Sequence, residues 1–154
     1  MVELAKEEEK KDMDEAVRAE FKEVCMMYCM IWGAGSKEQQ TTWQAGAAKL
    51  KGLFEESKAE MMAEVETNFA ENSTDGVANE AQFIAFTQKL ELLHAGRGVV
   101  MPAKSEALLK PAYECMNKWT EGKDGVSITD IWKQQELTPV IMGEIRKEAE
   151  EALE

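Results

Sequence analysis

Apolar residues early in the chain follow a helical spacing, with steps of four, three, four and three residues. They are Val17, Phe21, Val24, Tyr28 and Ile31. Since an α-helix has about 3.6 residues per turn, these side chains share one helical face. Gly33 and Gly35 favour the end of this helix. Residues 1–15 carry mostly Lys, Glu and Asp, and we expect a solvated helical extension or a frayed tail there.

A second helix is predicted from about Trp43 to Phe69. Thr41–Gln44 resembles a capping box, in which a hydroxyl is followed three residues later by Gln. The apolar stripe of this helix is Trp43, Ala47, Leu50, Phe54, Met61, Val65 and Phe69. Gly46 and Gly52 weaken the helix by about 1 kcal/mol each relative to Ala.

Shorter helices are predicted after a polar loop at residues 70–79. The first has the apolar face Phe83, Phe86, Leu90 and Leu93. Residues 96–104 follow as a linker, because they combine glycines with a proline. The next helix has the apolar face Leu108, Ala112, Met116 and Trp119. Pro111 either kinks this helix or lies in its first turn.

The last quarter of the chain starts with a second polar loop, Thr120 to Gly125. A short β-like run, residues 126–128, leads into a short helix that holds Ile131 and Trp132. Thr138–Pro139 predicts the start of a separate last helix, with a hydroxyl cap and Pro at its first position. The pattern as a whole predicts an all-α fold.

Composition narrows the function classes. The chain has 154 residues, 44% hydrophobic and 31% charged, a balance typical of a globular protein. The net charge of −12 disfavours nucleic acid and anionic lipid and suits cations or a basic partner. No apolar run spans a bilayer, and no signal segment is recognised. An odd count of three Cys argues against a disulfide framework, so we expect a cytoplasmic protein.

The first polar loop resembles an EF-hand loop. It reads Glu71-Asn72-Ser73-Thr74-Asp75-Gly76-Val77-Ala78-Asn79-Glu80-Ala81-Gln82. In that family twelve loop residues offer oxygens at positions 1, 3, 5, 7, 9 and 12, and Gly at position 6 makes the turn. Asp75, Gly76 and the apolar Ala78 match. Gln82 departs from the pattern, because an amide replaces the bidentate carboxylate, and Ser73 stands at position 3.

The second polar loop resembles the same family. Trp119 precedes it as an apolar anchor, and its first residues are Thr120-Glu121-Gly122-Lys123-Asp124-Gly125. The run Val126-Ser127-Ile128 before Asp130 is typical of the family. Thr120 and Gly122 depart from the pattern, and the second half is one residue short, which puts Asp130 where the bidentate carboxylate belongs.

The resemblance covers residues 61–137 and implies a paired, degenerate EF-hand-like unit. The domains expected are a charged extension (1–15), a helical hairpin (16–60), this pair (61–137) and a C-terminal helix (138–154). The hairpin is either a vestigial EF-hand or two plain packing helices. The resemblance implies these metal ligands: Glu71, Ser73, Asp75, Val77, Asn79, Gln82, Thr120, Asp124 and Asp130. Calcium needs six to eight oxygens, several of them charged, so we expect Ca²⁺ to bind weakly or not at all.

Two functions follow from the resemblance. The first is a calcium-responsive protein-interaction module that takes an amphipathic or basic helix of a partner protein. The alternative is a metal-free structural adaptor in a larger, cytoskeletal assembly. An enzyme is not expected. His94 is the only histidine, and the sequence pattern pairs it with no Ser or Cys nucleophile of a catalytic triad. Cys25 and Cys29 are interpreted as structural thiols.

Overall fold

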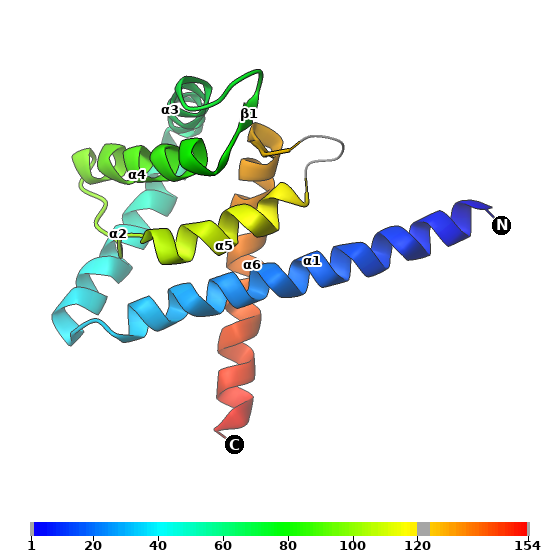
Figure 1. Ribbon diagram of the computed structural model, residues 1–154. Coiled ribbons are helices and arrows are strands. Elements are labelled where there is room, and N and C mark those ends of the chain that lie inside the picture. The colour runs from blue at the N-terminus through cyan, green and yellow to red at the C-terminus, as the bar shows by residue number, and fades with distance from the viewer. Residues whose placement is uncertain (1, 120–123, 154) are drawn as a thin grey trace.

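The structure is a computed structural model that describes residues 2–119 and 124–153, with side chains described from residue 15 onward (Figure 1). These parts of the chain hold six helices and one pair of two-residue strands, which confirms an all-α fold. The elements are α1 Val2–Gly33, α2 Lys37–Glu56, α3 Lys58–Glu71, β1 Val77–Ala78, α4 Glu80–Gly96, α5 Glu106–Asn117, β2 Val126–Ser127 and α6 Ile128–Ala152.

Two helix–strand–helix units share the main core. The first is α3, β1 and α4, and the second is α5, β2 and the start of α6. Strands β1 and β2 are antiparallel, with Val77 opposite Ser127 and Ala78 opposite Val126. The apolar faces of all four helices meet beneath this pairing. The buried core residues are Val65, Phe69, Ala78, Phe83, Phe86, Leu109, Ala112, Met116, Val126 and Ile131.

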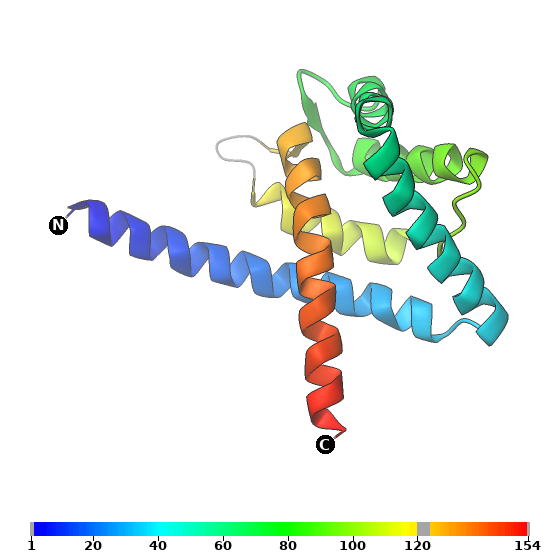
Figure 2. The ribbon, with the colours of Figure 1, turned by 180° about the vertical axis from the view of Figure 1, so that it is seen from behind.

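Helix α1 supplies none of the fully buried residues of this core, but its Val24 packs against them, and the helix crosses α5 and α6. Phe21 and Cys25 of α1 form a second buried cluster with Cys115 and Ile141. The N-terminal half of α1 and the C-terminal end of α6 project from the body in both views (Figure 1, Figure 2). Within residues 2–119 and 124–153, no helix combines the length and apolar character that a membrane crossing needs.

The first two helices have different bounds from those predicted. The charged extension is part of α1, which is continuous from Val2. Helix α2 begins at Lys37, because Ser36 forms the capping box: its Oγ accepts from Gln39 N at 3.1 Å. Thr41 therefore lies inside the helix and donates its hydroxyl to Lys37 O at 2.9 Å.

The predicted helix from Trp43 to Phe69 is two helices. Ser57 interrupts it with φ −130° and ψ 44°, and separates α2 from α3. The Ser57 amide still donates to Leu53 O at 2.8 Å, so the break is one residue long. The apolar stripe keeps its helical spacing across the break. The periodicity of the sequence therefore did not predict that the helix is interrupted.

Thr138–Pro139 does not start a separate helix, because α6 is continuous through both residues. The Thr138 hydroxyl donates to Gln134 O at 2.7 Å and accepts from Gln134 Nε2 at 2.8 Å. Continuation of the helix buries Ile141 completely against α1 and α5. Burial of a side chain of this size contributes about 1.5–3 kcal/mol, which offsets much of the roughly 3 kcal/mol that an internal proline costs.

The segment between α4 and α5 has no helix or strand, as predicted for the linker. It packs closely on α2 at Gly46. A Cβ at Gly46 would lie 2.1 Å from Val100 O, whereas a Cβ at Gly52 on the same helix would contact nothing within 4 Å. The contact positions the linker, and through it the start of α5.

Gly46→Ala should destabilise the protein by about 1–3 kcal/mol, because the added methyl collides with the linker backbone. Gly52→Ala is the matched control on the same helix and should stabilise by up to about 1 kcal/mol. Urea unfolding followed by circular dichroism measures both changes. Equal effects of the two substitutions would contradict this packing.

Candidate functional site

The first predicted ligand loop is closed by a tight backbone turn. Thr74 N donates to Val77 O at 2.9 Å, and Val77 N donates to Thr74 O at 3.1 Å. Between them, Asp75 and Gly76 have φ of 53° and 79°. Two successive positive φ values define a two-residue hairpin turn, for which Asp-Gly is a preferred pair. The Val77 carbonyl, a predicted ligand, is therefore already a hydrogen-bond acceptor within the turn.

Asn79 and Gln82 close the other end of this loop. Gln82 N donates to Asn79 Oδ1, and Asn79 N donates to Gln82 Oε1, both at 2.9 Å. This reciprocal capping box starts α4. The Gln82 amide nitrogen also donates to Thr74 Oγ1 at 3.1 Å. One side chain thus ties the exit helix to the turn and uses both its oxygen and its nitrogen.

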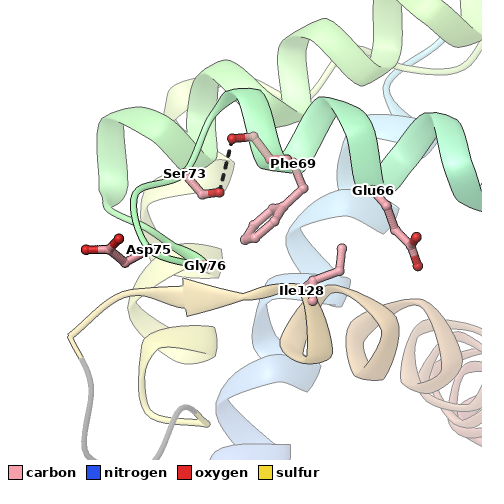
Figure 3. A pocket seen from close by; sticks show the side chains of 7 residues that line it. Glu66, Phe69, Ser73, Asp75, Gly76 and Ile128 are labelled. Carbon is pink, nitrogen blue, oxygen red and sulfur yellow. Dashed lines mark hydrogen bonds between the residues drawn. The ribbon is translucent and has the colours of Figure 1, made fainter.

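The other predicted ligands of this loop have separate partners or face solvent. Glu71 is exposed at the end of α3 and pairs with Lys89 Nζ at 2.6 Å. Ser73 donates its hydroxyl to Ala70 O at 3.5 Å. The Asp75 carboxylate is exposed and points outward from the turn, away from Phe69 (Figure 3).

The second loop is tied to α5 and α6 by its own side chains. Asn117 donates from Nδ2 to Asp124 Oδ1 at 3.1 Å, and Gly125 N donates to Asn117 Oδ1. The buried Asp130 carboxylate accepts from Ser127 N at 2.9 Å and from Ser127 Oγ at 3.0 Å. The bond from Ser127 N, together with Asp130 N donating to Ser127 Oγ at 3.3 Å, forms the capping box of α6. Thr120, also a predicted ligand, lies outside the described residues.

The strand pairing requires glycine at Gly125. Its φ is 132°, which side chains rarely adopt, and a Cβ there would lie 2.2 Å from Val77 Cγ1 and 2.8 Å from Ala78 O. By contrast, Gly76 has a positive φ but open space around it, since a Cβ would contact nothing within 4 Å. The two predicted turn glycines therefore have different roles: Gly76 shapes a turn, and Gly125 lets the two loops approach.

A surface cavity of about 380 Å³ lies beside the first loop (Figure 3). It opens between α3, the turn and the start of α6. Phe69 and Ile128 form its apolar side, and Glu66 and Asp75 lie at its edge. The two carboxylates are on different elements and flank apolar groups, so the cavity does not gather oxygens around one point.

The described donor set does not fit a calcium ion. Calcium requires six to eight oxygens, including several carboxylates, around one centre. Within residues 15–119 and 124–153, no three His, Cys, Asp or Glu side chains are grouped to hold a metal. The oxygens of Asn79 and Gln82 cap α4, and Glu71 is engaged with Lys89. The first loop is thus held by hydrogen bonds among its own groups.

Four residues that shape these loops were not among the predicted site residues: Thr74, Asn117, Ser127 and Asn68. Buried Asn68 joins α3 to α4 by donating from Nδ2 to Phe86 O at 3.1 Å. The sequence did contain a signal for Ser127, because a cap residue followed three positions later by Asp130 matches a capping box in outline. Asn117 and Thr74 had no comparable signal, since their partners are set by the tertiary fold.

Comparison with known proteins gives no match: no family model, no curated protein and no solved structure matches the chain.

Gly125→Ala should destabilise the protein by about 1–3 kcal/mol, because the methyl group strains the backbone and pushes β1 away from β2. Gly76→Ala is the matched control and should cost about 1 kcal/mol, from backbone strain alone. Chemical denaturation measures the two free energies of unfolding. If Gly76→Ala proved the more damaging, the close approach at Gly125 would not be what limits the pairing.

Proposed function

We propose that residues 61–137 form a degenerate EF-hand-like pair that works as a metal-independent protein-interaction module. Three features support this proposal. Two helix–loop–helix units are joined by a short antiparallel strand pair. Each loop is followed by a capped exit helix. Large apolar side chains remain exposed on α1, where a partner protein could cover them.

The single observation that carries the proposal is the bonding of Gln82. In the EF-hand pattern this position supplies the bidentate carboxylate that completes the calcium shell. Here its amide oxygen caps α4, and its amide nitrogen donates to the Thr74 hydroxyl. The amide N–H group of this side chain presents a partial positive charge to the loop, and no cation takes part in the contact. A loop held in this way has its exit helix fixed in the metal-free protein.

A calcium-responsive module is the second candidate. Asp124 and Asp130 favour it, because both carboxylates belong to the second loop and flank β2. Each already accepts hydrogen bonds from neighbouring groups, and Glu121, the third acid of this loop, lies outside the described residues. The metal-independent module therefore accounts for more of the described contacts.

Calorimetry with calcium should show no binding heat up to millimolar concentration. Tryptophan emission followed in parallel should stay constant, because Trp119 and Trp132 pack against the core whose geometry would change on opening. Micromolar binding accompanied by a change in emission would support the calcium-responsive candidate and contradict the metal-independent one.

A double variant tests whether the Thr74–Gln82 bond replaces a cation. Thr74→Asp with Gln82→Glu removes the bond and brings two carboxylates close to Asp75. The metal-free variant should lose about 0.5–1.5 kcal/mol, and millimolar calcium should restore part of that loss. Thr74→Ser is the control, because it keeps the hydroxyl. Thermal unfolding with calcium and with chelator measures each, and unchanged stability of the metal-free double variant would contradict the role given to this bond.

A further inference from the structure

A groove with an apolar floor lies between α1 and α5, away from the paired loops. Its volume is about 320 Å³. Helix α1 contributes Glu20, Glu23, Val24 and Met27, and helix α5 contributes Pro111, Glu114, Cys115 and its C-cap residue, Lys118. On each helix the steps are three, one and three residues, which is the spacing of one helical face.

The two walls run antiparallel, and their ends are fixed by polar contacts. Lys118 Nζ lies 2.7 Å from Glu20 Oε1, which joins the end of α5 to the middle of α1. At the other end, Tyr28 on α1 donates its hydroxyl to Pro102 O at 3.3 Å, just before α5 begins. The Lys104 ammonium lies 5.5 Å from the centre of the Tyr28 ring. These contacts fix the position of α1 relative to α5 and to the segment before α5.

The floor of the groove is apolar and uncharged. Val24, Met27 and Pro111 supply carbon and thioether surface. Burial, reinforced by the charge of Glu20, raises the pKa of the Cys115 thiol to about 12, so this thiol is neutral at physiological pH. Cys115 Sγ lies 3.6 Å from Val17 O, which holds it in place.

The rim of the groove is acidic. It carries three carboxylates and one ammonium. Glu20 is paired with Lys118, whereas Glu23 and Glu114 are exposed and have no ion-pair partner among the described residues. They come from opposite walls, so a cationic side chain seated over the floor would be attracted from both sides.

The apolar surface continues along α1 beyond the groove. Met27 is 38% exposed, Met26 is 49% exposed, and Met30, one turn further, is 73% exposed. Methionine is flexible and polarisable, so a row of exposed methionines adapts to apolar groups of varied shape.

We propose that the α1–α5 groove binds a lysine- or arginine-rich amphipathic helix of a partner protein. The apolar face of that helix covers Val24, Met27 and Pro111, and its flanking cations pair with Glu23 and Glu114. This inference rests on the proposed interaction function and assigns the partner's chemistry and its place. The net charge of −12 steers a basic segment toward the chain and repels acidic ones.

A helical model peptide of roughly 15 residues, built from Leu and Lys and labelled with fluorescein, provides the probe. Anisotropy titrations against the full chain, in the presence of a calcium chelator, should show saturable binding. An equivalent peptide of Leu and Glu should not bind. Calcium binding is measured separately by calorimetry without peptide, so failure of the proposed metal independence and failure of this groove are distinguishable.

Two variants locate the binding. Glu23→Gln with Glu114→Gln should weaken binding roughly tenfold, because two ion pairs at the rim are lost. Met27→Gln should weaken it roughly tenfold as well, through lost apolar contact. Glu55→Gln with Glu56→Gln removes the same charge at exposed positions of α2, and Leu92→Gln changes a side chain that is 73% exposed on α4. Both controls should bind as the unmodified chain does.

Several results would overturn the proposal. They are absence of binding to the Lys peptide, equal weakening by the control variants, and equal affinity for the Glu peptide. Sedimentation of the chain alone tests a second copy as the occupant, and a dimer that Met27→Gln dissociates would also overturn it. Circular dichroism of each variant verifies that loss of binding does not reflect loss of the fold.

Discussion

The backbone pairing between β1 and β2 is the constraint on which the arrangement of the other elements depends. Each strand is only two residues long, yet each lies between the end of one helix and the start of the next. Fixing Ala78 opposite Val126 therefore fixes the directions of four helices. The apolar faces of those helices then converge on one core, and Gly125 permits the approach because any side chain there would meet the opposite strand.

Much of the helical content could be predicted from periodicity, because the apolar stripe of each helix is present in the sequence. The ends of the helices were harder to predict. Pro139 favours a helix start by local chemistry, but burial of Ile141 against α1 needs the helix to continue. Ser57 interrupts a stripe whose spacing stays helical on both sides. In both cases a tertiary contact or a backbone dihedral angle decided the outcome, and neither is visible in a local pattern.

The candidate site was predictable as a pair of loop segments but not as a set of contacts. The order of residues around Gly76 and Gly125 located both loops. Asn79 and Gln82 were interpreted as ligands by their place in the pattern, whereas their spacing also matches a capping box, which satisfies backbone amides at the start of α4. Two local interactions competed for the same side chains. In the described structure both side chains form the capping box, which needs no ion.

Helix α1 gives the molecule two different surfaces. One face contributes Phe21 and Cys25 to a buried cluster, and the other leaves methionines exposed beside α5. A helix that packs on only part of its circumference can organise a core and still offer a surface to a partner. The same helix therefore connects the stability of the fold to its proposed interactions.

The bonds that close the first loop join amides to an amide or a hydroxyl, and none of these groups titrates between acid and neutral pH. Helix α1 is attached differently, through Phe21 and Cys25 and through ion pairs such as Arg18–Glu144 and Lys22–Glu148. The hydrogen bond from Arg18 lowers the pKa of Glu144, so its contribution is present at neutral pH and is lost as acid protonates the carboxylate. Salt screens these exposed pairs but has little effect on bonds between neutral groups. Acid or high ionic strength should therefore loosen the outer helix while the first loop keeps its geometry.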